Sequence, residues 1–203
     1  MMHDQEKIDE AHQVSLPPCA GIAMEQICLV QTAQHVEFAL TQLSAQTVLG
    51  FDTESKPIFN RGERSDGPHL IQLATRFEVF LFPVVSEVQI LLAAPVLKTV
   101  LEAAEIAKVG FGLGEDNRAL MRKLDIQIRG VIDLSRSLSE NRRKQLGAKA
   151  AVEKYFGQGL QKSKRISTSN WAAPTLNDKQ LKYAADDAHS ALLVYLAAQG
   201  LGV

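Results

Sequence analysis

Apolar residues gather in six short blocks along the chain, and polar or glycine-containing segments separate them. The blocks are rich in Val, Ile, Leu and Phe, which is typical of β-strands in a protein interior. We therefore predict strands over residues 27–31, 48–55, 70–75, 79–84, 106–111 and 130–135.

Other stretches place apolar residues three and four positions apart, which is the spacing of one helix face. The longest covers residues 86–104, where Pro95 is expected to begin a second helix because proline suits the first helical turn. Thr175 and Asp178 have capping-box spacing, so a last helix is expected over residues 175–198. Further helices are predicted over residues 33–42 and 115–123 and in a stretch that ends near Gly157.

The order of these elements favours an α/β fold. Three consecutive strands over residues 48–84 can form an antiparallel meander, and the later strands alternate with helices as parallel strands do. We expect a mixed sheet, with an antiparallel three-strand meander plus parallel strands, flanked by helices. The chain of 203 residues suits one such domain, over residues 25–203, after a mobile or loosely packed N-terminal arm over residues 1–24.

Composition indicates the cellular setting. The N-terminal segment MMHDQEKIDEAHQ is polar and acidic, unlike a signal peptide, and no apolar run approaches the roughly 18 residues of a membrane span. Cys19 and Cys28 are too few for a disulfide framework and lack the spacing of zinc ligands. We expect a cytoplasmic protein with reduced cysteines.

The strand VLGFDTES, Val48 to Ser55, ends with two acidic residues, Asp52 and Glu54. Side chains two positions apart on a strand point to the same face, about 6.6 Å apart along the chain. Two carboxylates placed in this way repel each other, so their spacing needs a functional explanation.

A glycine-containing turn, VGFGLGED, covers Val109 to Asp116 and resembles the phosphate-binding turn of dinucleotide folds. The third glycine position of that motif is Glu115, which would place acids where a pyrophosphate must bind. We therefore do not expect a nucleotide cofactor. Viewed alone, Glu115 and Asp116 fit simple capping of a helix N-terminus as well as they fit a chemical role.

The last predicted helix contains LKYAADDAHS, in which Tyr183 and Asp187 share one face because they are four residues apart. Asp187 lies near the margin of the apolar stripe, where an acid is more often solvated than a ligand. His189 lies on another side of the helix and is interpreted as a surface or supporting residue.

Taken together, FDTE at Phe51 to Glu54, GFGLGEDNRAL at Gly110 to Leu120 and YAADD at Tyr183 to Asp187 resemble the three exonuclease motifs of the DEDD superfamily. The resemblance is to the branch of ribonuclease D and the Werner syndrome exonuclease domain, and it covers about residues 27–197. The sister branch has a histidine five residues before the last aspartate. Lys182 occupies that position here, so the chain resembles the tyrosine (DEDDy) branch.

This resemblance implies a ribonuclease H-like fold and a metal-dependent 3′–5′ exonuclease that releases nucleoside 5′-monophosphates. It implies two divalent ions, Mg²⁺ or Mn²⁺, which suit hard oxygen ligands. Asp52 would bridge both ions, and Glu54 and Asp187 would complete the ion that binds the attacking water. Asp116 would help to hold the ion nearer the leaving 3′ oxygen, and Tyr183 would orient the water.

The formal net charge of −1 does not argue against nucleic acid, since two divalent ions would bring it to about +3 (−1 + 4). The segment from Asn141 to Arg165 contains eight Lys and Arg residues and one acid, Glu153, and could attract phosphates or form a solvated surface. A loop after the acidic strand offers a second basic group. The candidate phosphate-binding residues are Lys56, Arg61, Arg64, Lys162, Lys164 and Arg165.

Two aromatic residues near these segments have open roles. Phe59 could stack on a base, although a loop aromatic more often pins its own loop to the core. Trp171 is interpreted as a packing residue, with contact to the substrate as the alternative.

Two functions of different kinds fit the sequence. One is an exonuclease acting on single-stranded or frayed 3′ ends of DNA or RNA, and the other is a catalytically silent domain of the same fold that binds nucleic acid or a protein. A silent domain usually loses its ligands, because unpaired carboxylates are costly to keep without a metal. All five motif residues are present, which favours the enzyme. DNA and RNA stay equally possible, since discrimination depends on contacts to the 2′-hydroxyl.

Overall fold

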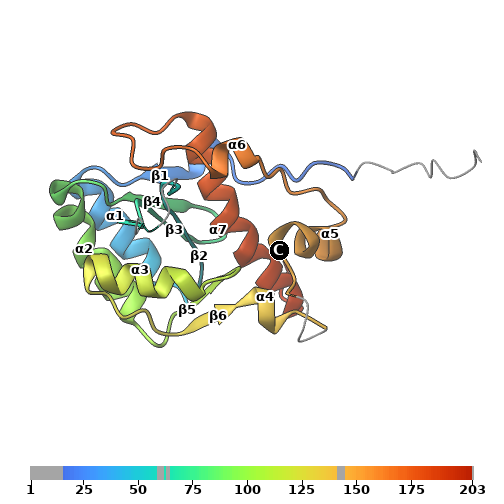
Figure 1. Ribbon diagram of the computed structural model, residues 1–203. Coiled ribbons are helices and arrows are strands. Elements are labelled where there is room, and N and C mark those ends of the chain that lie inside the picture. The colour runs from blue at the N-terminus through green and yellow to red at the C-terminus, as the bar shows by residue number, and fades with distance from the viewer. Residues whose placement is uncertain (1–15, 59–61, 63–64, 141–144, 203) are drawn as a thin grey trace, which may run out of the picture.

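The computed structural model describes residues 16–58, 62, 65–140 and 145–202. In these residues one six-stranded sheet runs through the molecule, with helices on both faces (Figure 1). The strand order is β1-β4-β3-β2-β5-β6. The strands are β1 (Ile27–Leu29), β2 (Val48–Glu54), β3 (Leu70–Ala74), β4 (Val79–Pro83), β5 (Ala107–Gly110) and β6 (Val131–Asp133).

The sheet is mixed, as the element order predicted. Strands β2, β3 and β4 form an antiparallel meander, in which Asp52 lies opposite Gln72. Strand β1 pairs with β4 in parallel, and β5 and β6 extend the sheet in parallel beyond β2. Strand β2 is thus a central strand, and the acidic motif lies at its C-terminal end.

Helices α1 (Ala33–Ser44), α2 (Glu87–Glu102) and α3 (Gly114–Leu124) cover one face of the sheet. Their buried residues form a core with Phe51, Leu73 and Phe80 of the sheet. Thr32 caps α1 by accepting a hydrogen bond from the His35 amide, and Ser86 and Gln89 form a capping box on α2. The packing and capping of these helices hold this face of the sheet in place.

The other face is covered mainly by α7 (Asp178–Ala198), with α5 (Ala148–Phe156) packed beside it. Helix α7 lies so close to β2 that a Cβ atom on Gly50 would be 2.0 Å from the carbonyl oxygen of Ala188. A glycine is therefore needed at this contact. Two short helices, α4 (Leu134–Ser137) and α6 (Lys164–Ser167), lie in the connections.

The prediction that Pro95 begins a second helix is wrong. Helix α2 continues through Pro95 as one element. Pro95 is on the exposed side of the helix, where water can bind the carbonyl group that loses its amide partner. On the opposite side Val96, Leu97 and Val100 are buried, and their packing holds the helix together.

The predicted capping box of the last helix is displaced by two residues. Helix α7 begins at Asp178, and Asn177 and Gln180 exchange the capping hydrogen bonds. Asparagine is a strong N-cap residue and glutamine suits the third helical position, so this pair satisfies the free amide groups. Thr175 lies in the preceding loop.

In the described part of the N-terminal arm, residues 16–24, most side chains are exposed, and the backbone is hydrogen-bonded to the domain. Ile22 is buried, and Cys19 donates its amide hydrogen to the Gly159 carbonyl oxygen at 3.0 Å. Residues 1–15 lie outside the described residues. Within the described residues, no helix combines the length and apolar composition that a membrane crossing requires.

Candidate active site

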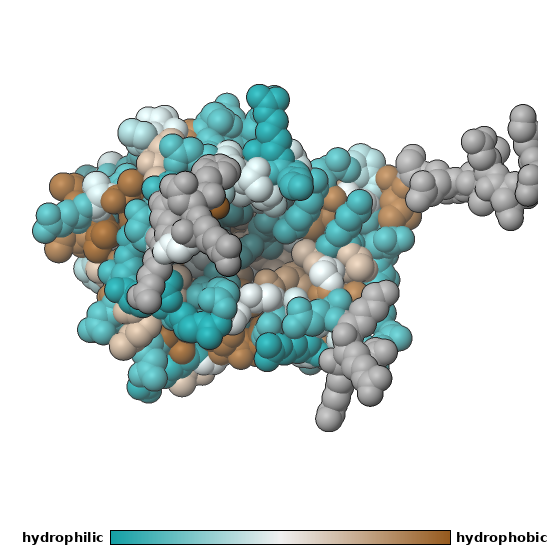
Figure 2. Space-filling model, in the orientation of Figure 1, coloured by the Kyte–Doolittle hydropathy of each residue, from teal (hydrophilic) through white to brown (hydrophobic). Residues whose placement is uncertain are grey.

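The site is built at the C-terminal end of β2, under helix α7. Asp52 and Glu54 are both half-buried there, and the alternation of the strand directs them to the same side. Strand β3 lies on one side of β2 and β5 on the other, so the backbone that carries both acids is fixed by pairing. Figure 2, in the orientation of Figure 1, shows a hollow near the middle of the molecule, bordered by both hydrophilic and hydrophobic residues.

Helix α7 brings Tyr183 and Asp187 to the same place. Asp187 is only 7% exposed, so it is a buried acid and not the solvated flank that its position in the sequence allowed. Burial raises the pKa of the Asp187 carboxyl, while the charge and hydrogen bond of Lys162 and, to a smaller extent, a hydrogen bond with the Tyr183 side chain lower it. The two residues thus form one unit over the end of β2.

Trp171 fixes the ring of Tyr183. Its own side chain is fully buried, and the two ring centres lie 6.2 Å apart. The indole Nε1 donates a hydrogen bond to the carbonyl oxygen of Ser167 at 3.1 Å. These contacts confirm the interpretation of Trp171 as a packing residue.

Asp116 reaches the site from the first turn of α3, on the other side of β2. The Thr53 hydroxyl donates a hydrogen bond to Asp116 Oδ1. Because Thr53 lies between Asp52 and Glu54, it ties the helix to the acidic strand. The neighbouring Glu115 points elsewhere, since it forms an exposed ion pair with Arg118.

The charges of the four acids affect one another's pKa values, which shows that their carboxyl groups lie close together. Burial raises the pKa of Glu54 to about 9, and the charges of Asp52 and Asp187 add to this rise. Burial also holds the pKa of Asp52 well above its usual range, and the charges of Asp187 and Asp116 contribute. Burial likewise raises the pKa of Asp116. The negative charges are therefore poorly compensated by the protein.

Lys162 provides positive charge to this cluster. Its Nζ lies 2.9 Å from Asp187 Oδ1, and its charge lowers the pKa of Asp52 and Glu54 as well as that of Asp187. The same Nζ is 5.8 Å from the centre of the Tyr183 ring. The lysine side chain is 35% exposed, so it lies at the boundary between the acids and solvent.

The acids are suited to hard divalent ions. Among the described residues, no group of three or more His, Cys, Asp or Glu side chains is placed so that it could hold a metal ion. Mg²⁺ is commonly held by one or two carboxylates together with water and substrate phosphate oxygens, so it does not require three protein side chains. The oxygen donors and the uncompensated charge of this site fit that mode of binding.

Among the described residues, the other basic candidates form no ion pair with the four acids. Lys164 and Arg165 are exposed on the short helix α6. The backbone amide of Lys56 donates to His69 Nδ1 at 3.2 Å, directly beyond β2. Phe59, Arg61 and Arg64 lie outside the described residues. Within the basic segment, Lys154 Nζ lies 2.5 Å from Glu140 Oε1, so the charge of this lysine is partly neutralised.

Sequence reasoning missed Gln72, which lies on β3 directly opposite Asp52. Gln72 is fully buried, and its side-chain nitrogen and oxygen have no partner among the described residues. Buried amides are rarely left without partners. A hydrated ion next to Asp52 would provide one, which supports the fit of a metal at this place. The sequence could have indicated Gln72, because it is a polar residue in the middle of the apolar strand LIQLA.

Of the two interpretations of His189, the surface position is wrong. His189 is buried, and its Nε2 lies 3.0 Å from the carbonyl oxygen of Arg76. It therefore joins α7 to the turn after β3. A view of one helix alone could not reveal this contact.

Comparison with known proteins agrees with this geometry. Residues 27–198 match the family model described as 3'-5' exonuclease. The chain is 30% identical over 163 residues to the bifunctional 3'-5' exonuclease/ATP-dependent helicase WRN of Mus musculus, covering 79% of this chain and 11% of that protein. The chain therefore belongs to the 3'-5' exonuclease family, and it is a member of the DEDD superfamily that resembles ribonuclease D and WRN.

Solved structures show the same fold. The Aedes aegypti Nibbler EXO domain matches with a TM-score of 0.71 and 24% identity, covering 88% of this chain and 89% of that one. Trypanosoma brucei RNase D matches with a TM-score of 0.76 and 22% identity, covering 86% and 65%. The fold is thus a ribonuclease H-like mixed sheet flanked by helices, as the motifs implied.

Proposed function

We propose that this protein is a metal-dependent 3′–5′ exonuclease that hydrolyses nucleic acid to nucleoside 5′-monophosphates. One observation supports the proposal most strongly: two acids of β2, Asp52 and Glu54, lie close to Tyr183 and Asp187 of α7 at the C-terminal end of the strand. Asp116 lies beside them through its bond to Thr53. The match to the 3'-5' exonuclease family model supports a role of these residues in phosphodiester hydrolysis.

Asp52, Glu54, Asp116 and Asp187 would hold two Mg²⁺ or Mn²⁺ ions. These ions would supply an activated water and would stabilise the leaving oxygen of a phosphodiester. The protein contributes the placement of the oxygen ligands. Pairing of β2 with both of its neighbours and the close packing of α7 make that placement rigid.

Tyr183 would orient the attacking water. Burial raises the pKa of its hydroxyl, and the charges of Asp187 and Glu54 raise it further. The hydroxyl therefore keeps its proton at neutral pH and acts as a hydrogen-bonding group, not as a base. Packing against Trp171 limits the movement of the ring.

The substrate would be a single-stranded or frayed 3′ end of DNA or RNA. One structure of T. brucei RNase D, with a TM-score of 0.72, is a complex with RNA U12, which supports a nucleic-acid strand as the ligand here. Lys162, Lys164 and Arg165 would contact phosphates on one side of the acids. Lys56, Arg61 and Arg64 would do so from the loop after β2.

The test is the incubation of purified protein with 5′-labelled single strands of DNA and RNA, with Mg²⁺, Mn²⁺ or EDTA. We expect a ladder that shortens from the 3′ end only when a metal is present. Blocking the 3′ end with a phosphate should slow the first step, and a 5′ block should not. A protein that binds the strands but never shortens them would be the catalytically silent module instead.

A further inference from the structure

His69, the residue that precedes β3, connects the C-terminal end of β2 to the residue that follows β4. It is only 2% exposed. Its backbone amide donates to the Glu54 carbonyl oxygen at 2.8 Å, and its own carbonyl oxygen accepts a hydrogen bond from the Val84 amide at 2.9 Å. His69 therefore lies at the place where the backbone of the acidic strand leaves the sheet.

The imidazole ring of His69 holds the chain that follows Glu54. Lys56 lies two residues beyond Glu54, and its amide donates to His69 Nδ1 at 3.2 Å. Regular pairing of β2 with β3 ends at Glu54 and Leu70. Pro68 has no amide hydrogen to donate at the next step of the ladder. The His69 ring therefore provides a contact at the point where the backbone ladder ends.

The hydrogen bond with Lys56 also fixes the protonation of the ring. Because an amide hydrogen points at Nδ1, this nitrogen is the acceptor and the ring proton is on Nε2. Nε2 lies 3.2 Å from Asp66 Oδ1, but among the described residues it has no partner with hydrogen-bond geometry. Asp66 is 71% exposed, so this contact is weak. The bond to Lys56 is therefore the directed contact of the ring.

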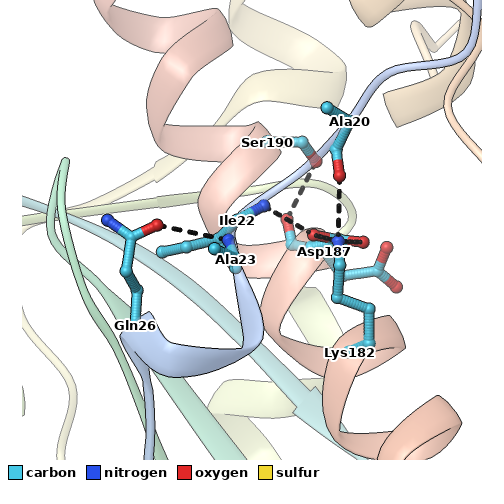
Figure 3. Close-up of polar contacts among 8 residues, drawn as sticks. Ala20, Ile22, Ala23, Gln26, Lys182, Asp187 and Ser190 are labelled. Atoms are coloured by element: carbon cyan, nitrogen blue, oxygen red, sulfur yellow. Dashed lines mark hydrogen bonds and ion pairs between the residues drawn. The ribbon is translucent and has the colours of Figure 1, made fainter.

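Other contacts hold two of the remaining site acids. The Thr53 hydroxyl donates to Asp116 and so ties α3 to β2. Asp187 lies on α7, and Figure 3 shows contacts between this helix and the N-terminal arm, in which Lys182 donates to the carbonyl oxygen of Ala20 at 3.2 Å. Each of these two acids thus lies on a helix that is fixed near the acid itself.

Glu54 differs from these acids because it is the last residue of its strand. Pairing with Leu70 fixes its backbone up to that point, but a rotation of residues 55–56 would turn the next peptide and the Glu54 carboxylate with it. A side chain that holds a metal ion must stay within about 0.5 Å of its working position. The bond from the Lys56 amide to the His69 ring restricts this rotation.

We propose that His69 is a positioning residue for the metal-binding acids. Its ring holds the Lys56 amide and thereby keeps the Glu54 carboxylate directed toward the ion. The proposal rests on the proposed function, because that function supplies the ion. His69 itself touches neither the ion nor the strand.

Two pairs of variants test this hydrogen bond from its two sides. His69→Leu removes the acceptor, whereas His69→Asn keeps a side-chain oxygen close to the position of Nδ1. Lys56→Pro removes the amide hydrogen, whereas Lys56→Ala removes only the side chain and keeps the amide. The second member of each pair is the matched control for the first.

The measurement is a calorimetric titration with Mn²⁺ in the absence of nucleic acid. His69→Leu and Lys56→Pro should each weaken Mn²⁺ binding about tenfold, the lower end of the range for residues that orient metal ligands. His69→Asn and Lys56→Ala should stay within about threefold of the wild type, well below that range. The double variant should bind no more weakly than either single variant, because both changes remove the same bond.

His35 provides a control for the loss of a histidine elsewhere. Its Nδ1 accepts a hydrogen bond from the Gln31 amide at 3.4 Å, next to β1, which β4 and β3 separate from β2. His35→Leu should leave Mn²⁺ affinity unchanged. Denaturant melts in EDTA accompany each titration, because a purely structural role of His69 would lower the free energy of unfolding and leave Mn²⁺ affinity unchanged.

Two results would overturn the proposal. One is an Mn²⁺ affinity in His69→Leu and Lys56→Pro that equals that of the wild type. The other is an His69→Asn protein that binds Mn²⁺ as weakly as His69→Leu. If His69→Leu does not fold, the comparison of Lys56→Pro with Lys56→Ala decides the question alone.

The titrations also separate this proposal from the proposed function. If the variants bind Mn²⁺ as expected but the wild type never shortens a strand, the exonuclease function fails and the role of His69 at the metal site stands. If the wild type shortens strands and His69→Leu and Lys56→Pro bind Mn²⁺ normally, the role of His69 fails and the exonuclease function stands.

Discussion

The acidic residues of the candidate site and its basic residues differ in the secondary structure on which they lie. All four acids lie on regular elements, namely the end of β2, the first turn of α3 and the buried side of α7. Of the described basic candidates, Lys56 and Lys162 lie in irregular connections, and Lys164 and Arg165 begin the four-residue helix α6. Of these, Lys162 forms an ion pair with a site acid, whereas Lys164 and Arg165 are exposed.

This difference shows what sequence spacing can predict. On a strand or a helix the period fixes the direction of each side chain, so Asp52 and Glu54, or Tyr183 and Asp187, must point together. In an irregular connection the direction of a lysine depends on tertiary contacts. Spacing therefore predicted the acids as a group but could not distinguish Lys162 from its neighbours.

The largest expected effect concerns Tyr183 on the acidic side. Tyr183→Phe removes the hydroxyl and keeps the ring that packs on Trp171. Single-turnover cleavage should fall by about 10²–10⁴-fold, as is typical when a group that positions a proton or a water is lost. Mn²⁺ binding and strand affinity should stay close to those of the wild type, because the hydroxyl is not proposed as a ligand.

Tyr195→Phe, farther along α7, is the matched control and should cleave normally. A Tyr183→Phe protein that cleaves within about threefold of the wild type, far less than the range for such groups, would remove the water-orienting role.

A smaller effect should separate Lys162 from Lys164. Lys162 competes with a metal for Asp187, so Lys162→Gln should tighten Mn²⁺ binding about fivefold, which corresponds to an ion pair of ~1 kcal/mol. The same change should weaken strand binding and reduce its salt slope by about one. Calorimetry measures both constants. Lys164→Gln should affect strand binding alone; equal Mn²⁺ affinities in Lys162→Gln and the wild type would show that the ion pair does not compete.

The smallest effect is on stability against pH in EDTA. The folded pKa values of Asp52 and Glu54 lie above their unfolded values, so the folded state holds extra protons and is relatively more stable at low pH. Their contribution should be lost as the pH rises from about 4 through about 9. Denaturant melts should show this loss, on the order of 1 kcal/mol after allowance for solvent screening.

Asp52→Asn should flatten this part of the pH curve. The difference between the two proteins isolates the acidic cluster from other titrating groups, such as buried Lys108, whose pKa is lowered to about 8 by burial. Identical pH curves for the two proteins would mean that the acids do not interact.

Much of the fold could be predicted because the strands are short apolar blocks and the meander is local in sequence. The errors arose where tertiary contacts override local rules. Pro95 stays inside α2 because its ring faces solvent, and His189 is buried because α7 meets the turn at Arg76. The bond from Thr53 to Asp116 joins residues 63 positions apart, and no local pattern encodes it.

The most direct test of the central claim, that Asp52 belongs to a metal-binding catalytic centre, is a thermal melt with and without Mn²⁺. At a metal concentration about 100-fold above Kd, the wild type should melt roughly 5–10 °C higher. Asp125→Asn, at an exposed position with positive φ that asparagine tolerates, should behave like the wild type. Asp52→Asn should show no shift and should melt without metal at or above the wild-type temperature. An equal Mn²⁺ shift in Asp52→Asn would contradict the account.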